Sequence, residues 1–164
     1  HGPGNKGNLN LLYKVVKNGI PWPLASFDNR RSFLSIDNLN YLIHEMVINS
    51  SVPSGIYNFS DDESISTNTL IEIISKAENK NTKLLSVNKN LIIKLAKCGD
   101  LFRLPLNSER LKKLTESYES SNLKIKKTLG LKQLPVTTKE GLFKTIKSFK
   151  IWRNSRCYYF FSYY

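Results

Sequence analysis

The sequence predicts a mixed α/β or α+β domain, because short extended runs alternate with amphipathic segments along the chain. Its 164 residues, of which 40% are hydrophobic, allow one ordinary domain or part of a larger one. Residues 30–38 show the alternation most clearly. Two arginines lead into an apolar run, and Asp37-Asn38 then opens an amphipathic segment.

Seven segments carry apolar residues at helical spacing and are predicted to be helices. The first stops at Asn18-Gly19, the second starts at Asp37 or Asn38, and the fourth ends at Gly99. The predicted helices cover residues 8–18, 38–48, 66–77, 88–98, 108–114, 122–129 and 137–149.

Helix caps and extended segments complete the expected pattern. Ser66 and Ser108 are expected to cap helices, and Thr137 and Glu140 have the three-residue spacing of a capping box. Prolines exclude a helix at residues 20–24, and short β-like runs predict further extended pieces. These pieces are residues 30–36, 55–59, 82–87 and 118–120.

The net charge of +12 does not by itself indicate a nucleic-acid-binding protein. Residues 1–80 hold 7 Lys/Arg and 8 Asp/Glu, whereas residues 81–164 hold 18 and 5. The C-terminal lysines alternate with apolar residues at helical spacing, which is typical of the wet faces of surface helices. A stand-alone basic module that binds nucleic acid or another polyanion is kept as the alternative function.

No metal site or disulfide is expected from the sequence. The acidic run Asp61-Asp62-Glu63 lacks a further oxygen ligand at EF-hand spacing, so a solvated loop before a capped helix is expected. His44 has no ligand partner at suitable spacing and is interpreted as a surface or edge histidine. Cys98 and Cys157 are interpreted as free thiols.

No run approaches the roughly 20 apolar residues of a membrane helix, and no secretory signal is expected. We therefore expect a cytoplasmic protein without a membrane partner. The aromatic ending at residues 150–164 is expected to lie outside the fold, as a tail after a domain at residues 1–149.

Six motifs occur in an order that resembles a known family. They are His1-Gly2-Pro3-Gly4, Asn8-Leu9, the segment from Arg31 to Asn38, Gly55-Ile56-Tyr57-Asn58, Ser66, and Lys124 to Leu129-Gly130. This order is similar to that in the C-terminal half of extended short-chain dehydrogenases/reductases, the NAD-dependent nucleotide-sugar epimerases and dehydratases of the UDP-glucose 4-epimerase type. The resemblance covers about residues 1–149. Within these motifs, His1 replaces the family's usual Tyr and Ser32 its usual Asp.

The resemblance implies a Rossmann-type α/β protein of which this chain is the substrate-binding part, with short strands and several helices. It implies that a UDP-sugar or similar nucleoside-diphosphate sugar is held mainly by this part. Arg31 would pair with the diphosphate, and Arg110 would be a second phosphate ligand. The other implied substrate contacts are Asn8, Leu9, Trp22 and Leu24.

The resemblance further implies NAD as cofactor, with NADP not excluded, bound mainly by an N-terminal half that this chain lacks. His1 and Pro3 would lie next to the nicotinamide. The family's glycine-rich dinucleotide turn and its Tyr-x-x-x-Lys pair in a fitting context are absent from the chain. We therefore expect no catalytic residue here and no activity of the chain alone, and we expect a full-length relative to be a homodimeric isomerase-type enzyme.

Overall fold

Helices dominate the structure, a computed structural model that describes residues 1–5, 8–102 and 107–160; for residue 8 and residues 151–160 it describes the backbone alone. All seven predicted helices are present in the described part of the chain. They are α1 (Asn8–Lys17), α2 (Ile36–Ile48), α3 (Thr67–Ala77), α4 (Lys89–Phe102), α5 (Ser108–Thr115), α6 (Leu123–Leu129) and α7 (Thr138–Phe160).

Several predicted helix ends are confirmed by capping contacts. The Ser66 hydroxyl accepts from the Thr69 amide at 3.0 Å at the start of α3. Before α7, Thr137 and Glu140 form the predicted capping box, in which each accepts from the other's backbone amide, at 3.3 and 3.1 Å. Gly19 and Gly130 follow α1 and α6 with φ of 69° and 67°, the left-handed conformation that glycine adopts most readily.

Three predicted helix ends are wrong by a few residues. Helix α2 begins earlier than expected because Ser35, and not Asp37 or Asn38, is its N-cap. Helix α5 is capped by Asn107 rather than Ser108. Helix α4 continues through Gly99, which is buried on the same helix face as Ile92 and Ala96, so packing rather than a turn explains this glycine.

The predicted strands are the main correction to the fold class. No regular strand forms among the described residues; the extended segments meet only at isolated bridges, Trp22 with Leu84, Leu24 with Ser86, and Arg31 with both Ile65 and Tyr118. At residues 20–24 the prolines lack the amide hydrogen that a ladder needs. Residues 55–59 form no bridge, and the Ile56 carbonyl accepts from the Lys124 ammonium at 2.8 Å instead.

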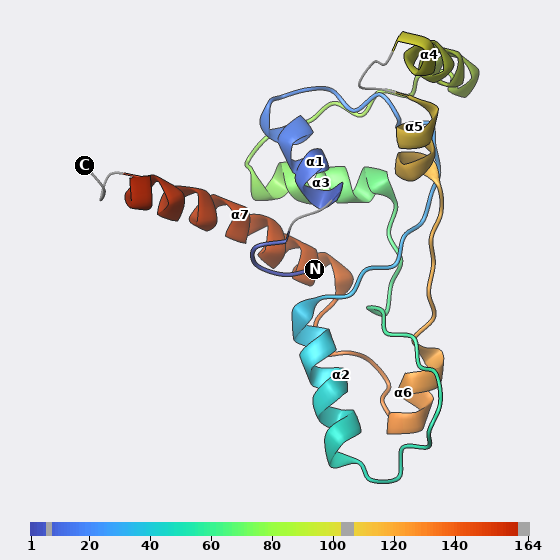
Figure 1. The fold of residues 1–164 in the computed structure, drawn as a ribbon, viewed down its shortest axis with the longest axis vertical. Coiled ribbons are helices and arrows are strands. Elements are labelled where there is room, and N and C mark those ends of the chain that lie inside the picture. The colour runs from blue at the N-terminus through green and yellow to red at the C-terminus, as the bar shows by residue number, and fades with distance from the viewer. Residues whose placement is uncertain (6–7, 103–106, 161–164) are drawn as a thin grey trace.

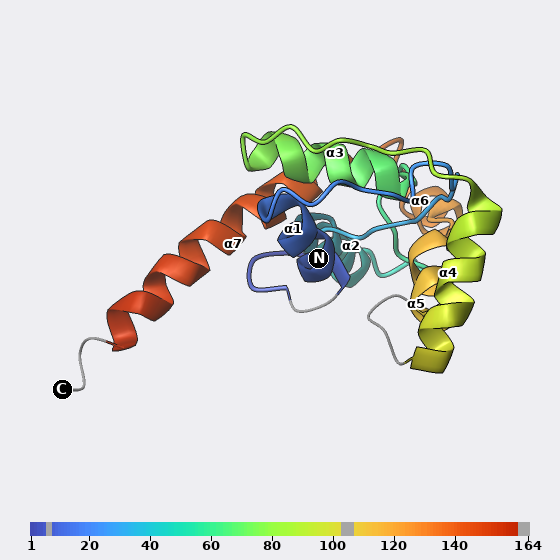
Figure 2. The same ribbon diagram turned by 90° about the horizontal axis from the view of Figure 1, so that it is seen from above.

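Two hydrophobic clusters divide the core. The larger one lies among α1, α3, α4, α5 and α7, in the upper part of Figure 1. The smaller one joins α2 to α6 and the loop after α6, at the bottom of the same view, through Leu42, Ile125 and Leu134. Seen from above, α3 lies along α7, and α4 with α5 forms the opposite edge (Figure 2).

Long extended segments connect the two parts, running side by side between them (Figure 1). The segment around residue 31 bridges Ile65 on one side and Tyr118 on the other. Helix α7 continues in backbone to Phe160, past the end predicted at residue 149, while residues 161–164 lie outside the described chain. The separation of a tail at 150–164 stays a prediction. Among the described residues, no helix has the length and apolar character needed to cross a membrane.

We predict that Leu42→Ala lowers the free energy of unfolding by about 2–5 kcal/mol, because the Leu42 side chain is fully buried in the smaller cluster. Val47→Ala is the matched control, because Val47 lies on the same helix and is 78% exposed. Its effect should stay within about 0.5 kcal/mol. Urea unfolding of both variants measures the difference, and equal losses would show that the α2–α6 cluster does not stabilise the fold.

Candidate functional site

Arg31 lies where three extended segments meet. Its amide donates to the Ile65 carbonyl at 2.9 Å, and its carbonyl accepts from the Ile65 amide at the same distance. On the other side, the Ser32 amide donates to Tyr118 and the Tyr118 amide donates to Arg30. The backbone of residue 31 is therefore held from both sides, which fixes the position from which its side chain projects.

The Arg31 side chain extends toward the C-terminal end of α5. Its Nη2 donates to the Lys113 carbonyl, one of the last-turn carbonyls of that helix. Its Nε is buried and has no hydrogen-bond partner. Burial lowers the pKa of Arg31 from its ordinary value, and the nearby Glu116 carboxylate opposes that change. A guanidinium has five donor hydrogens, so the single bond to Lys113 leaves donor capacity for an anion.

The structure brings Arg31 together with a second predicted site residue, Leu9. Both line a small cavity of about 50 Å³ between α1, α3 and α5. The remaining lining residues are Leu12, Phe33, Thr67, Leu70 and Leu114. Arg31 supplies the positive charge in this otherwise largely apolar lining.

Ser32, the position where the family's usual acid is missing, has a clear structural use. Its hydroxyl accepts from the Ser120 amide at 2.9 Å and donates to the Ser120 carbonyl at 3.2 Å. Ser60 donates to the same carbonyl at 2.9 Å. Ser32 therefore continues the pairing between the segments at 31–32 and 118–120. The adjacent Arg30 is largely exposed, donates to the Ser64 hydroxyl and lies 3.4 Å from the Glu119 carboxylate.

The other predicted substrate contacts are dispersed. Arg110 is exposed and lies in the first turns of α5, whereas Arg31 contacts the C-terminal end of the same helix. Trp22 and Leu24 are each 4% exposed, and the Trp22 indole nitrogen donates to the Asn68 side chain at 3.1 Å. This geometry favours the core role of Trp22 over stacking on a base. Asn8 begins α1, but its side chain lies outside the described residues.

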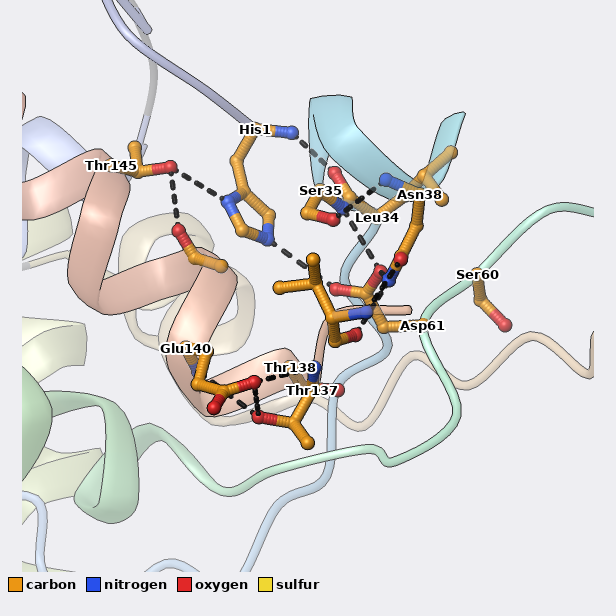
Figure 3. A network of polar contacts seen from close by, with 12 residues as sticks. His1, Leu34, Ser35, Asn38, Ser60, Asp61, Thr137, Thr138, Glu140 and Thr145 are labelled. Atoms are coloured by element: carbon orange, nitrogen blue, oxygen red, sulfur yellow. Dashed lines mark hydrogen bonds and ion pairs between the residues drawn. The ribbon is translucent and has the colours of Figure 1, made fainter. Parts of the chain in front are cut away.

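The two residues predicted beside the nicotinamide differ in exposure. Pro3 is exposed, whereas the His1 side chain is 5% exposed and turned inward. Figure 3 shows the His1 ring between Thr145 of α7 and Asp61. The His1 ring faces inward in this structure and the Pro3 side chain faces outward, and the nicotinamide contacts at both residues stay predictions.

Asp61 corrects the prediction that residues 61–63 form a solvated loop. Asp61 is 3% exposed, and its Oδ1 accepts from the Ser35 amide at 3.0 Å and from the Asn38 side chain at 2.7 Å (Figure 3). The Asn38 amide also bonds both ways with Val136, as a donor at 2.8 Å and an acceptor at 3.1 Å. The residue types at 61–63 do not predict these buried hydrogen bonds, because an Asp-Asp-Glu run is usually solvated. Only the Asn38 position, on the inner face of α2, could have suggested it.

The two neighbouring carboxyl groups have pKa values shifted in opposite directions. Burial raises the pKa of Asp61 above its ordinary value, against the hydrogen bonds from Asn38 and Ser35. For Asp62, burial also acts to raise the pKa, but bonds from Lys126, the Leu134 amide and Asn122 together hold it below the usual range. His44 lies on the surface, as expected, with its side chain 68% exposed. Within the described residues, no group of three or more His, Cys, Asp or Glu side chains is arranged to hold a metal ion.

We predict that the Asp62 contacts stabilise the fold above the ordinary carboxyl pKa and that this contribution is lost as pH falls through the lowered folded-state pKa. Asp62→Asn should therefore destabilise the protein at pH 7 and reduce its loss of stability in acid. Denaturant unfolding between pH 7 and pH 2.5 measures both effects. Glu109→Gln is the control, because Glu109 is exposed and its bond to Lys113 stays within one helix. If Asp62→Asn lost as much stability between pH 7 and pH 2.5 as the wild type, the proposed stabilisation by the Asp62 contacts would be contradicted.

Comparison with known proteins gives one sequence match and a consistent set of structural matches. No protein-family model matches the chain. A UDP-glucose 4-epimerase from Vibrio cholerae is 32% identical over 151 residues, which are 91% of this chain and 44% of that protein. The chain thus spans less than half the length of the curated relative that it matches.

The structural matches have low sequence identity and establish the fold alone. The Bordetella bronchiseptica enzyme WbmF, solved with NAD+ and UDP, superposes with a TM-score of 0.62 at 19% identity, over 94% of this chain and 44% of WbmF. An epimerase from Methanothermobacter thermautotrophicus gives 0.63 at 15%, over 96% and 43%. The Thermotoga maritima UDP-glucose 4-epimerase, solved with UDP-glucose, gives 0.56 at 14%, over 93% and 44%. The resemblance to the C-terminal half of an extended short-chain dehydrogenase/reductase, predicted from the order of six motifs, is therefore confirmed in sequence and in fold.

Proposed function

We propose that this chain is the substrate-binding part of an NAD-dependent nucleotide-sugar epimerase or dehydratase, and that it holds the diphosphate of a UDP-sugar through Arg31. The observation that carries this proposal is the joint placement of Arg31 and Leu9, two residues implied by the family motifs, around one cavity. The match to a UDP-glucose 4-epimerase over 91% of the chain supports it.

The chemistry of Arg31 suits a diphosphate. The guanidinium is planar and permanently charged, so it can give two parallel charge-assisted bonds to phosphate oxygens. Its backbone is fixed by Ile65 and Tyr118, and its buried Nε lacks an acceptor. An incoming phosphate would share or replace the Lys113 carbonyl as the acceptor for Nη2.

The other residues implied by the resemblance have smaller proposed roles. Arg110 is exposed on α5 and is proposed as a second phosphate ligand. Trp22 and Leu24 are buried, so any role toward a uracil base would be to support the wall of the site. The substrate contact at Asn8 and the NAD contacts at His1 and Pro3 remain predictions. Hydride transfer is the chemistry that NAD supplies when bound, and no residue described here is assigned to that step.

Titration of the protein with UDP-glucose, followed by amide chemical shifts, tests the proposal. We predict shifts around Leu9 and Arg31, and an affinity about 10- to 150-fold weaker in Arg31→Gln, as expected for loss of a charge-assisted bond of about 1.5–3 kcal/mol. Arg30→Gln is the matched control because Arg30 is adjacent but points to Ser64 and Glu119. The control should bind like the wild type.

UDP and glucose titrated separately locate the contact on the ligand. UDP should reproduce the shifts near Arg31, and glucose should not. A folded protein that shows no response to UDP-glucose near Leu9 and Arg31, or equal weakening by Arg30→Gln and Arg31→Gln, would contradict the proposal.

A further inference from the structure

The His1 imidazole lies in a buried junction of three segments. Its Nδ1 is 3.0 Å from the Thr145 hydroxyl on α7, and its Nε2 is 3.5 Å from Asp61 Oδ2. The ring packs edge to face against Phe33, with centroids 5.8 Å apart. The His1 carbonyl accepts from the Ile36 amide at 2.8 Å, which ties the same residue to the start of α2.

The hydrogen on one ring nitrogen can be assigned from the Thr145 hydroxyl. A hydroxyl has a single hydrogen, and Thr145 donates it to the Gly141 carbonyl at 2.9 Å. While that bond is in place, the hydroxyl oxygen can only accept from His1, and this arrangement favours a hydrogen on Nδ1. A neutral imidazole has only one N–H, so in that state Nε2 would be a bare acceptor.

That bare acceptor would face a carboxylate oxygen. His1 Nε2 and Asp61 Oδ2 are both buried, neither has a hydrogen-bond partner, and the 3.5 Å between them is within ion-pair distance. Two acceptors at this distance in a buried site repel each other unless a proton lies between them. We propose that His1 and Asp61 share one bound proton in the folded state, forming a buried proton-binding pair that fastens the first residues and the loop at 61 against α7 at neutral pH.

The surroundings supply few other charges. Asp61 Oδ1 faces the Ser35 amide and the Asn38 side chain, which are neutral, and α7 presents Thr145 and Gly141 to the ring. Burial raises the pKa of Asp61 above its ordinary value. The ion pair of Lys144 with Asp37 and the Glu140 carboxylate lie on the exposed surface of α7 and α2.

Space around the ring is tight. A Cβ on Gly141 would come within 3.2 Å of the His1 ring and 2.8 Å of Ser35 Cβ. The ring therefore has little room to move away from Asp61 when the proton is lost. Deprotonation should weaken the contact between α7, the loop at 61 and the start of α2.

The sign of the pH dependence follows from linkage. Above about pH 6.5 an unfolded histidine is neutral and an unfolded Asp is ionised, so the unfolded pair holds no proton. The folded pair still holds one, so the folded state binds more protons and stability falls as pH rises. We predict that the folding equilibrium constant falls by up to about tenfold per pH unit above pH 6.5, the limit for one proton, until the folded pair releases it.

Two substitutions test the proton assignment. In Asp61→Asn the side-chain oxygen can keep the bonds from Ser35 and Asn38 while its amide donates to a neutral His1, so the pH-dependent loss should disappear. In Thr145→Val the constraint on Nδ1 is removed, so a neutral ring can place its hydrogen on Nε2 and the slope should flatten. Unfolding curves from pH 6 to 9 for the wild type and both variants measure this. Equal slopes in all three proteins would overturn the proposal.

Histidine NMR of the wild type gives a test that does not depend on how the variants fold. The chain has two histidines, and the exposed His44 on α2 gives the second ring signal. We expect the His1 ring nitrogens to keep the signature of a proton shared with Asp61 above about pH 6.5, where an unfolded histidine is neutral. A His1 ring that is already neutral just above that pH would also overturn the proposal. Neither test involves UDP-sugar binding, so its outcome is separate from that of the proposed function.

Discussion

The backbone pairing at residue 31 is the contact on which the rest of the structure depends. Hydrogen bonds to Ile65 and Tyr118 join three extended segments that come from distant parts of the chain. Above this junction lies the larger cluster of α1, α3, α4, α5 and α7, and below it the α2–α6 cluster (Figure 1). Since each cluster is assembled from these connected segments, the junction fixes their relative positions and places the Arg31 guanidinium at the end of α5.

Buried polar side chains reinforce this junction. The Asn29 side chain donates to the Thr67 hydroxyl at 2.8 Å and the Leu114 carbonyl at 3.3 Å, linking the start of α3 to the end of α5. Asn38 and Asp61 do the same between α2, the loop at 61 and the segment before α7. A fully satisfied buried network specifies one arrangement of the chain, because any other leaves polar atoms without partners. His1, Asp61 and Arg31 are among the residues that retain a buried side-chain atom without a hydrogen-bond partner, and these three atoms carry the proposals made above.

Much of the fold follows from local sequence patterns, and most of the polar contacts do not. The helices and the Thr137–Glu140 capping box depend on residues close in the chain, so spacing alone predicts them. The strand predictions are wrong because strand pairing depends on residues distant in the sequence. Here Arg31 pairs with Ile65 and Tyr118 at single bridges and no ladder forms. Asp61 was assigned to solvent for the same reason. Its partners Ser35 and Asn38 lie more than twenty residues away, and no local pattern marks them.

Motif order predicts Arg31 and Leu9 as site residues, and they line one cavity, but motif order does not predict the contacts that each side chain makes. The residue type of Trp22 fits either stacking on a base or filling the core, and its 4% exposure favours the core. Ser32 shows that a departure from a family pattern can have a structural meaning, since its hydroxyl continues the pairing with Ser120.

The central claim is that Arg31 is the diphosphate ligand of a UDP-sugar site in this chain. A crystal structure of the protein with UDP-glucose tests it most directly. We expect the diphosphate within hydrogen-bond distance of the Arg31 guanidinium, with the nucleotide extending past Leu9. UDP-glucose bound elsewhere, with the Arg31 side chain still engaged only by the Lys113 carbonyl, would contradict it.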